Sequence, residues 1–352
     1  MENERLLFIY LSSHVHISSE DALAFIKGDS SSGKSRLGAR RVCEVLSRGT
    51  FPGEAGKIVE YCDGNDISII AYPDTSYPDK LKHTGYAPPA LYVRGDSSIV
   101  ERFAGAVVGS RKPTQAGLRF CRKLAEEMAL NDIPVISGFA RGIDTCAHRW
   151  ALEGNGKTVA VFGSGVDVIY PGENEELYHE VIESGCVLSR FPPGTQPFGW
   201  NFPIRNSIIA ALSDFVCVVE AAQKSGSLIT ARYGAEYGKE VFSVPGNPLF
   251  PQSEGANRLI KNGAHPLTGI ADILEAFGLS ATKPKKKRKR RNDPDMTEIE
   301  TRVLEILTDG MSLDDVASVM TEGIKDVSAA LVMLEVKKLV ERGPDGYYFR
   351  LA

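Results

Sequence analysis

Short polar turns rich in glycine, serine and arginine follow several of the most apolar runs in the sequence. Gly109, Ser110 and Arg111 follow one such run, and Gly138 and Arg141 follow the next. Small residues let a ligand approach the backbone closely, and the planar guanidinium of arginine matches the oxygens of a phosphate group. These turns therefore predict an anion-binding site, with a phosphate as the ligand that suits them best.

Two later segments carry the same residue types. The further candidates are Arg205, Asn206, Lys224, Ser225, Gly226 and Ser227. Each segment opens a predicted helix, and the first N–H groups of a helix attract anions because they have no partner within the helix. Tight turns need small residues in any case, which explains most of the single glycines. Three arginines expected at the same edge of one predicted sheet are better explained by an anion-binding site.

Several kinds of enzyme site are not supported. A dinucleotide fingerprint needs G-x-G-x-x-G and a later acid, whereas the first turn reads GSRKPTQAG and the next strand ends without an acid. We interpret Asp144, Asp167 and Glu220 as helix-cap or strand-end residues, and His148 as a packing residue. We therefore expect no catalytic residue and no cofactor, and a polyanion backbone as the ligand.

The cysteine and histidine pattern bears on metals and on location. The six cysteines form no C-x-x-C pair and the six histidines form no H-E-x-x-H motif, so we expect reduced thiols and no metal site. The first residues lack a secretory-signal pattern, and no apolar run approaches the roughly 18 residues of a membrane span. We expect a cytoplasmic protein.

The elements that would position the candidate residues alternate between strand and helix. Predicted strands are 67–72, 90–94, 104–110, 134–138, 158–163, 186–189, 215–220 and 240–246. Predicted helices between and after them are 115–130, 144–152, 173–184, 204–212, 228–238 and 270–277. This alternation is typical of an α/β fold with a doubly wound, mostly parallel sheet, whose ligand lies beyond the carboxyl ends of the strands.

Four segments are expected along the chain. Residues 1–66 form an N-terminal helical domain, 67–277 the α/β core, 278–296 a basic linker, and 297–352 a small C-terminal domain. The last segment has three helical patterns and a Pro-Asp-Gly turn, which is typical of a winged helix. Within it, Ser312 and Asp315 have the spacing of a capping box.

The net charge of −4 averages segments that differ strongly. The linker has eight basic and two acidic residues, whereas residues 101–277 carry a net −3 and residues 297–352 a net −5. Binding of a polyanion by the core must then rest on locally placed arginines. The linker run 283–291 is either an arm that contacts phosphates or a solvated spacer. The acidic C-terminal domain favours contact with a protein over contact with DNA.

Residues 28–35, GDSSSGKS, match the P-loop pattern G-x-x-x-x-G-K-[ST]. In that interpretation Lys34 would contact phosphates and Ser35 a magnesium ion. The residues before Gly28 have a helical pattern, and no buried strand ending in aspartate follows. We therefore interpret the run as a flexible loop between two helices, and a P-loop NTPase acting through Lys34 remains a less favoured alternative.

Several motifs in order resemble the DprA/Smf family of DNA-processing proteins. They include VVGSRKPT (107–114), VISGFARGIDTCAHRWAL (135–152), NFPIRNSIIAALSD (201–214) and KSGSLITARYGAEYGKEVFSVPGN (224–247). The resemblance runs from about residue 69 to 277. It implies an extended Rossmann-like core and a C-terminal winged helix. It also implies a non-enzymatic homodimer that binds single-stranded DNA, protects incoming DNA and loads RecA during natural transformation.

The resemblance also assigns roles to residues. It makes Arg111 the leading phosphate ligand and places Ser110, Gly138, Arg141, Asn206, Ser225 and Gly226 around the same pocket. Some relatives have a lysine just after the Tyr170-Pro171 turn, where this chain has Gly172 and Glu173, which gives more weight to Lys224 or the linker. The main alternative is a related nucleotide N-glycosidase, but its P-G-G-x-G-T turn with a following glutamate is absent from the sequence.

Overall fold

The computed structural model describes residues 2–14, 17–28, 33–48, 51–82, 84, 87–280, 296–307, 310–337, 339–342 and 346–350. It divides the chain into two compact units, residues 1–284 and 285–352. The linker run 283–291 lies outside the described residues. So do residues 29–32 of the P-loop-like run, together with the side chains of Lys34 and Ser35.

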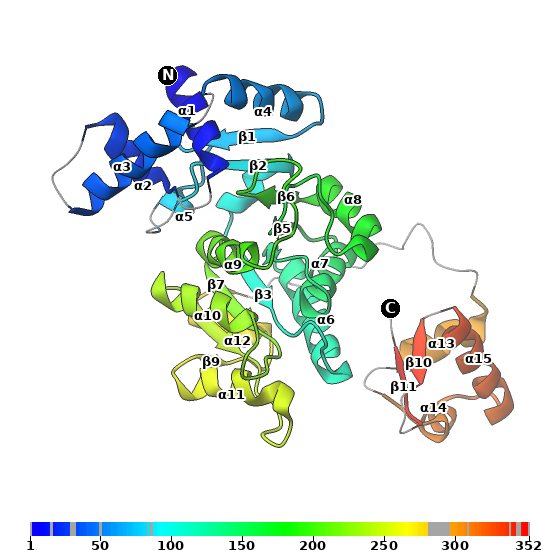
Figure 1. Cartoon of the computed structure of the whole chain (residues 1–352). Helices are drawn as coiled ribbons and strands as arrows, with labels where there is room; N and C mark the ends of the chain where they lie inside the picture. The colour runs from blue at the N-terminus through cyan, green and yellow to red at the C-terminus, as the bar shows by residue number, and fades with distance from the viewer. Residues whose placement is uncertain are drawn as a thin grey trace. The chain divides into compact units, whose positions relative to one another are not determined.

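The first unit is built on one large sheet (Figure 1). Its strands are β1 (Ser68–Ala71), β2 (Ala90–Gly95), β3 (Gly105–Val108), β4 (Val135–Ser137), β5 (Thr158–Phe162), β6 (Cys186–Ser189), β7 (Phe215–Val218), β8 (Glu240–Ser243) and β9 (His265–Pro266). The spatial order is β1-β2-β6-β5-β4-β3-β7-β8-β9. Neighbours from β6 to β9 are parallel, whereas the β1–β2 and β2–β6 pairs are antiparallel. The predicted α/β fold with a mostly parallel sheet is confirmed.

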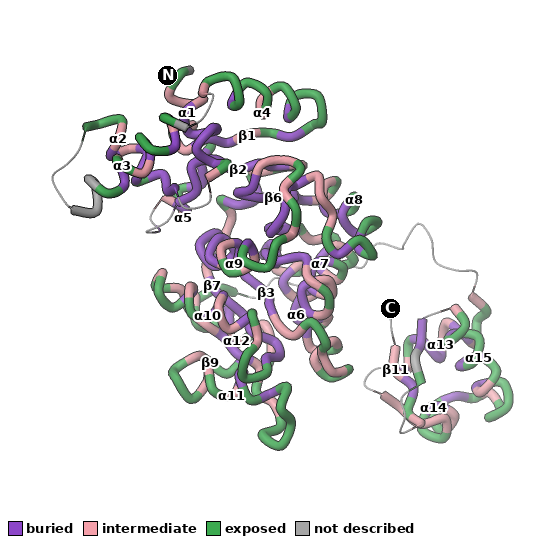
Figure 2. The backbone as a smooth tube through the Cα atoms, viewed as in Figure 1, coloured by how far each residue is buried: buried purple, intermediate pink, exposed green. Residues whose placement is uncertain are grey.

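Helices cover both faces of this sheet. One face packs against α6 (Gln115–Leu130), α7 (Ile143–Glu153), α8 (Glu175–Ser184) and α12 (Ile270–Ala276). The other face packs against α9 (Asn201–Leu212), α10 (Ser227–Glu236) and α11 (Glu254–Lys261). The side chains of β3 alternate between these layers, with Ala106 and Val108 in one core and Val107 in the other, as the period of a strand requires. Figure 2 shows the strands buried between exposed outer helix surfaces.

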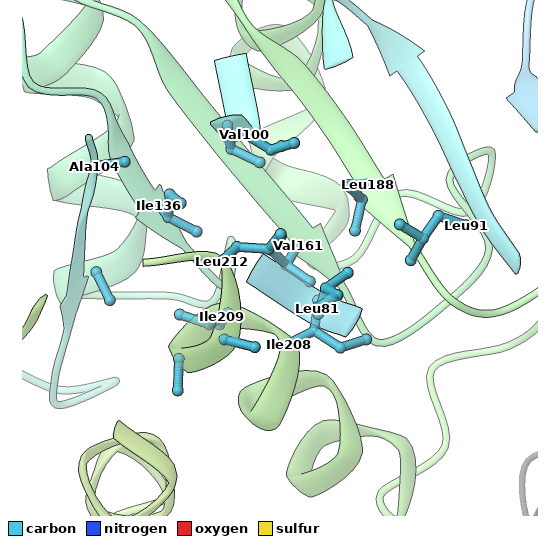
Figure 3. Packing of buried hydrophobic residues seen from close by; sticks show 14 of the residues in the cluster. Leu81, Leu91, Val100, Ala104, Ile136, Val161, Leu188, Ile208, Ile209 and Leu212 are labelled. Carbon is cyan, nitrogen blue, oxygen red and sulfur yellow. The ribbon is translucent and has the colours of Figure 1, made fainter. Parts of the chain in front are cut away.

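Helix α9 is anchored to the sheet by its apolar residues. Ile208, Ile209 and Leu212 pack against Ile136 and Val161 in one buried cluster (Figure 3). This packing fixes α9, whose second turn carries the predicted site residues 205 and 206. A rigid element of this kind holds site residues more accurately than a loop does.

The N-terminal helices are α1 (Glu2–Ser12), α2 (Ser19–Ile26), α3 (Gly33–Arg48) and α4 (Gly53–Asp63), and a short α5 (Asp79–Lys82) lies between β1 and β2. Helices α1 and α4 pack against β1, and their shared cluster includes Ala71 from that strand. Ser12 at the end of α1 is hydrogen bonded to the buried Tyr92 hydroxyl of β2, with the two oxygens 2.6 Å apart. The helices thus pack directly on this end of the sheet and belong to the same compact unit.

The second unit contains α13 (Glu298–Ile306), α14 (Leu313–Val319), α15 (Ile324–Val336) and an antiparallel pair, β10 (Val340–Arg342) and β11 (Tyr348–Arg350). Val303, Val316 and Leu331 form part of its core. The predicted capping box is confirmed, because Ser312 and Asp315 exchange hydrogen bonds between side chain and backbone. Among the described residues, no helix of either unit is long and apolar enough to cross a membrane.

Candidate nucleic-acid interface

A pocket lies where the turns after β3, β4 and β5 meet the first turn of α9. It is shallow and open to solvent, and its cavity volume is only about 20 Å³. The lining residues are Arg111, Gly138, Ala140, Arg141, Tyr170, Pro171 and Phe202. Three of the residues predicted from the sequence, Arg111, Gly138 and Arg141, thus meet at one place. This position beyond the carboxyl ends of parallel strands is where open α/β sheets bind ligands.

Arg111 is exposed and reaches over an aromatic ring. Its guanidinium carbon lies 5.5 Å from the centroid of the Phe202 ring, within the range of a cation–π interaction. The backbone around it is fixed, because the Ser110 carbonyl accepts a hydrogen bond from the Ile143 N–H at 3.1 Å. A Cβ atom at Gly109 would also overlap the Ile143 side chain. Because this backbone is already ordered, binding of a ligand by the Arg111 guanidinium requires no further ordering of the turn.

Gly138 is required by close packing on both sides. A Cβ atom there would overlap the guanidinium of Arg205 and the carboxylate of Asp144. The Gly138 N–H donates to Asp144 at 3.2 Å, and its carbonyl accepts from Arg205. The next residue, Phe139, has a φ of 61° and is buried, with its ring 5.1 Å from that of Phe162. The turn after β4 is thus set by buried neighbours and not by the pocket's ligand.

Arg205 differs from Arg111 in its surroundings. It is only 3% exposed, and its Nη1 donates to the carbonyls of Gly138 and Val161, the latter at 2.8 Å. Burial lowers the pKa of Arg205 to about 10, which still leaves it charged at neutral pH. Its guanidinium lies 5.6 Å from the centroid of the Phe202 ring. Arg205 therefore holds the backbone of the Gly138 turn from the protein interior, whereas Arg111 lies at the solvent-exposed mouth of the pocket.

Arg141 is exposed but paired. Its Nε and Nη2 donate to the two carboxylate oxygens of Glu173 at 2.7 and 2.6 Å. The hydrogen bond to Glu173 raises the pKa of Arg141, and the same bond lowers the pKa of Glu173. Glu173 occupies the segment after Tyr170-Pro171 where some relatives are expected to carry a lysine. In this chain, the positive charge at that edge of the pocket is therefore partly neutralised.

The segment after β7 forms a second, adjacent surface. The described residues that line the pocket do not include Lys224, Ser225, Gly226, Ser227 or Asn206. Asn206 links the two regions, because its Nδ2 donates to the Gly226 carbonyl at 3.2 Å. The hydroxyls of Ser225 and Ser227 lie 2.8 Å apart, and Lys224 is exposed.

The acidic residues and the histidine near the site have structural partners, as expected. Glu220 accepts hydrogen bonds from the N–H and the hydroxyl of Thr114, the N-cap residue of α6, and Asp167 accepts from the Gly194 N–H. His148 is fully buried beside Thr158, and burial lowers its pKa to about 3. Among the described residues, no group of three or more potential metal ligands lies together.

Two aromatic residues of the pocket were not among the predicted site residues. The guanidinium carbons of Arg111 and Arg205 lie 5.5 and 5.6 Å from the centroid of the Phe202 ring, and the Tyr170 ring lies 5.9 Å from it, centroid to centroid. The segment Phe202-Pro203 before Arg205 was visible in the sequence as a helix start. The place of Phe202 in the pocket depends on how α9 packs against residues from other turns, which the local sequence does not indicate.

The model of the family described as DNA recombination-mediator protein A matches residues 68–278. The chain belongs to this family. It is 38% identical over 286 residues to protein Smf of Escherichia coli K12. This alignment covers 79% of this chain and 76% of the Escherichia coli protein. It is 41% identical over 204 residues to the DNA processing protein DprA of Streptococcus pneumoniae R6, covering 58% of this chain and 72% of the relative.

Two solved structures of the family resemble this chain. The crystal structure of DprA from Streptococcus pneumoniae has a TM-score of 0.67 at 31% identity. The match covers 78% of this chain and 98% of the Streptococcus pneumoniae chain. DprA from Helicobacter pylori, studied for its single-stranded DNA binding mode, has a TM-score of 0.55 at 29% identity, with coverage of 60% and 95%. The predicted resemblance is confirmed. The family is described as a DNA recombination mediator.

Proposed function

We propose that this DprA/Smf protein binds single-stranded DNA through the pocket around Arg111, protects incoming DNA and loads RecA during natural transformation. The observation that carries the proposal is the exposed Arg111 guanidinium over Phe202 at the mouth of the pocket. The guanidinium suits a phosphate, and the aromatic rings beside it suit a nucleobase. The single-stranded DNA binding of the Helicobacter pylori relative supports the same ligand.

The other predicted residues receive roles within this proposal. Arg141 contributes a second cation at the pocket, and Gly109, Ser110 and Gly138 let the strand approach the backbone. Arg205 positions the Gly138 turn. Asn206 and residues 224–227 extend the contact surface along the end of β7, where Lys224 adds an exposed positive charge.

The proposal is tested by competition between single-stranded and duplex oligonucleotides of equal length at several salt concentrations. We expect tighter binding of the single strand, because a narrow pocket with aromatic walls fits a flexible backbone with accessible base faces. Each phosphate contact should add about 0.7 to the slope of log affinity against log salt. Equal affinity for duplex would contradict the pocket as a single-strand site.

The C-terminal unit is proposed to be a winged helix that contacts a protein partner. Its three helices and hairpin support the first point, and its net charge of −5 supports the second. We also propose a homodimer as the active form. A tight gel shift of DNA by residues 297–352 alone would contradict the protein-contact role.

Glu173→Gln is expected to increase affinity for single-stranded DNA. The change removes the carboxylate that pairs with Arg141 and releases its guanidinium for phosphate. Since both groups are exposed, the expected gain is modest, roughly two- to fivefold in a fluorescence-anisotropy titration at low salt. Glu176→Gln is the matched control, because it removes the same charge from the neighbouring helix. Equal gains in both variants would show a general charge effect and contradict a specific role of the ion pair.

A further inference from the structure

Phe198 and Trp200 form an exposed, stacked pair just before α9. Their ring centroids are 4.8 Å apart and their planes differ by 8°. Phe198 is 47% exposed and Trp200 66% exposed. Single exposed apolar residues are common on protein surfaces, but a stacked aromatic pair with both rings exposed presents an outer ring face as a flat apolar surface. We call this pair the aromatic platform.

The loop that carries the aromatic platform is held by polar contacts. Asn201 donates from Nδ2 to the carbonyls of Gly163 at 3.0 Å and Gln196 at 3.3 Å. The Gly165 N–H donates to the Thr195 carbonyl at 2.9 Å. These bonds tie the loop to the turn after β5 without using either ring. The platform is therefore preorganised, and its rings are not needed to anchor the loop.

The aromatic platform lies next to the Arg111 pocket along the chain. Trp200 directly precedes α9, and Phe202 in the first turn of that helix lines the pocket. Two residues span at most about 7 Å. Trp200 therefore lies within reach of the nucleotide that follows one whose phosphate contacts Arg111.

We propose that the aromatic platform stacks a nucleobase of the single strand whose backbone occupies the Arg111 pocket. This proposal rests on the proposed function. The exposed face of the Trp200 indole receives the base, and the Phe198 ring is stacked on the opposite face of the indole. Stacking accepts any base, because every base has a π-face. Duplex DNA keeps its bases stacked on one another, so the platform also contributes to discrimination against duplex.

The chain has two tryptophans, so its fluorescence can report on the platform. Trp150 is partly buried on α7, with the Arg122 guanidinium 4.0 Å from its ring centroid. We expect an oligothymidine to quench the emission of the full-length protein, and Trp200→Phe to abolish most of this quenching. Trp200→Ala should weaken oligothymidine binding about tenfold in an anisotropy titration, the effect expected for one stacked base.

An oligonucleotide of abasic sites provides a test that needs no variant. It keeps the phosphates and lacks the bases, so the wild-type protein should bind it more weakly, and Trp200→Ala should show a clearly smaller difference in affinity between the two oligonucleotides. Leu130→Ala is the control, since it shortens an exposed apolar residue at the end of α6, on the opposite edge of the sheet. It should behave as wild type in every titration.

The two proposals fail in different ways. Unchanged emission and equal binding of thymidine and abasic strands, with binding itself intact, would overturn the aromatic platform and leave the proposed function standing. This is also the outcome expected if the platform instead contacts a protein. Absence of binding to any single strand by the wild-type protein would overturn the proposed function and the platform together.

Discussion

Arg111→Ala is expected to weaken binding of a single-stranded oligonucleotide by roughly tenfold to a hundredfold, the effect of losing one charge-assisted hydrogen bond to phosphate. The Arg111 side chain is exposed at the pocket mouth, and none of the described acidic side chains forms an ion pair with it. The salt slope should fall by about 0.7. Anisotropy titrations over a range of salt concentrations measure both quantities.

Two further variants separate the position of this charge from its presence. Arg111→Lys keeps the charge and loses the planar fork, so we expect partial recovery of affinity. Lys123→Ala removes an exposed charge from the middle of α6, away from the pocket, and should change affinity little. An Arg111→Ala protein that binds single strands as tightly as wild type would contradict the pocket model.

Arg205→Ala is expected to destabilise the fold by about 3–5 kcal/mol. Two buried carbonyls, of Gly138 and Val161, would lose their donor, and the buried Asp144 would lose a nearby cation. Urea unfolding followed by circular dichroism measures the loss. Arg232→Ala, which removes an exposed arginine of α10, should cost less than about 0.5 kcal/mol. Similar stability of the two variants would contradict the supporting role of Arg205.

The destabilisation by Arg205→Ala should also depend on pH. Burial raises the pKa of Asp144, and the charge of Arg205 opposes that rise. Without Arg205 the pKa of folded Asp144 rises further, so the folded state retains a proton that the unfolded state releases. Stability then falls as pH increases through the folded pKa. The difference between variant and wild type should therefore be larger at about pH 8 than at about pH 5.

The elements of the core could be predicted because each has a strong local pattern. Strand 186–189 and helix 115–130 have the predicted bounds, the latter because Thr114 caps the helix and its apolar residues recur at helical spacing. Helix α9 starts at Asn201, three residues earlier than predicted, since the Asn201 side chain is bonded to Gly163 of a distant turn. Such a contact leaves no signal in the local sequence.

Two elements near the end of the core were not predicted. The structure has α11 over Glu254–Lys261 and β9 over His265–Pro266. Helix α11 has no side-chain cap, and its Gly255 packs directly against the backbone of Ala221. Strand β9 has two exposed residues at the edge of the sheet and no apolar run. Tertiary packing determines both elements, so local patterns could not reveal them.

The candidate site illustrates the same limit at the level of side chains. Arg111, Arg141 and Arg205 look equivalent in the sequence, since each belongs to a segment at the carboxyl edge of the sheet. In the structure the first is exposed, the second is paired with Glu173, and the third is buried beneath Gly138. The sequence predicted their common location. It did not predict their different surroundings, which depend on residues contributed by other turns.

The first strand of the sheet has a consequence for where the folded core begins. The family match starts at residue 68, the first residue of β1, and β1 lies at one edge of the sheet. Helices α1 and α4 pack on this strand and bury Ala71 completely. A chain trimmed to the matched region would keep β1 and lose the helices that cover it, so the apolar side chains that they bury would be exposed. We therefore expect a chain that begins at residue 68 to be less stable and less soluble than the full-length protein.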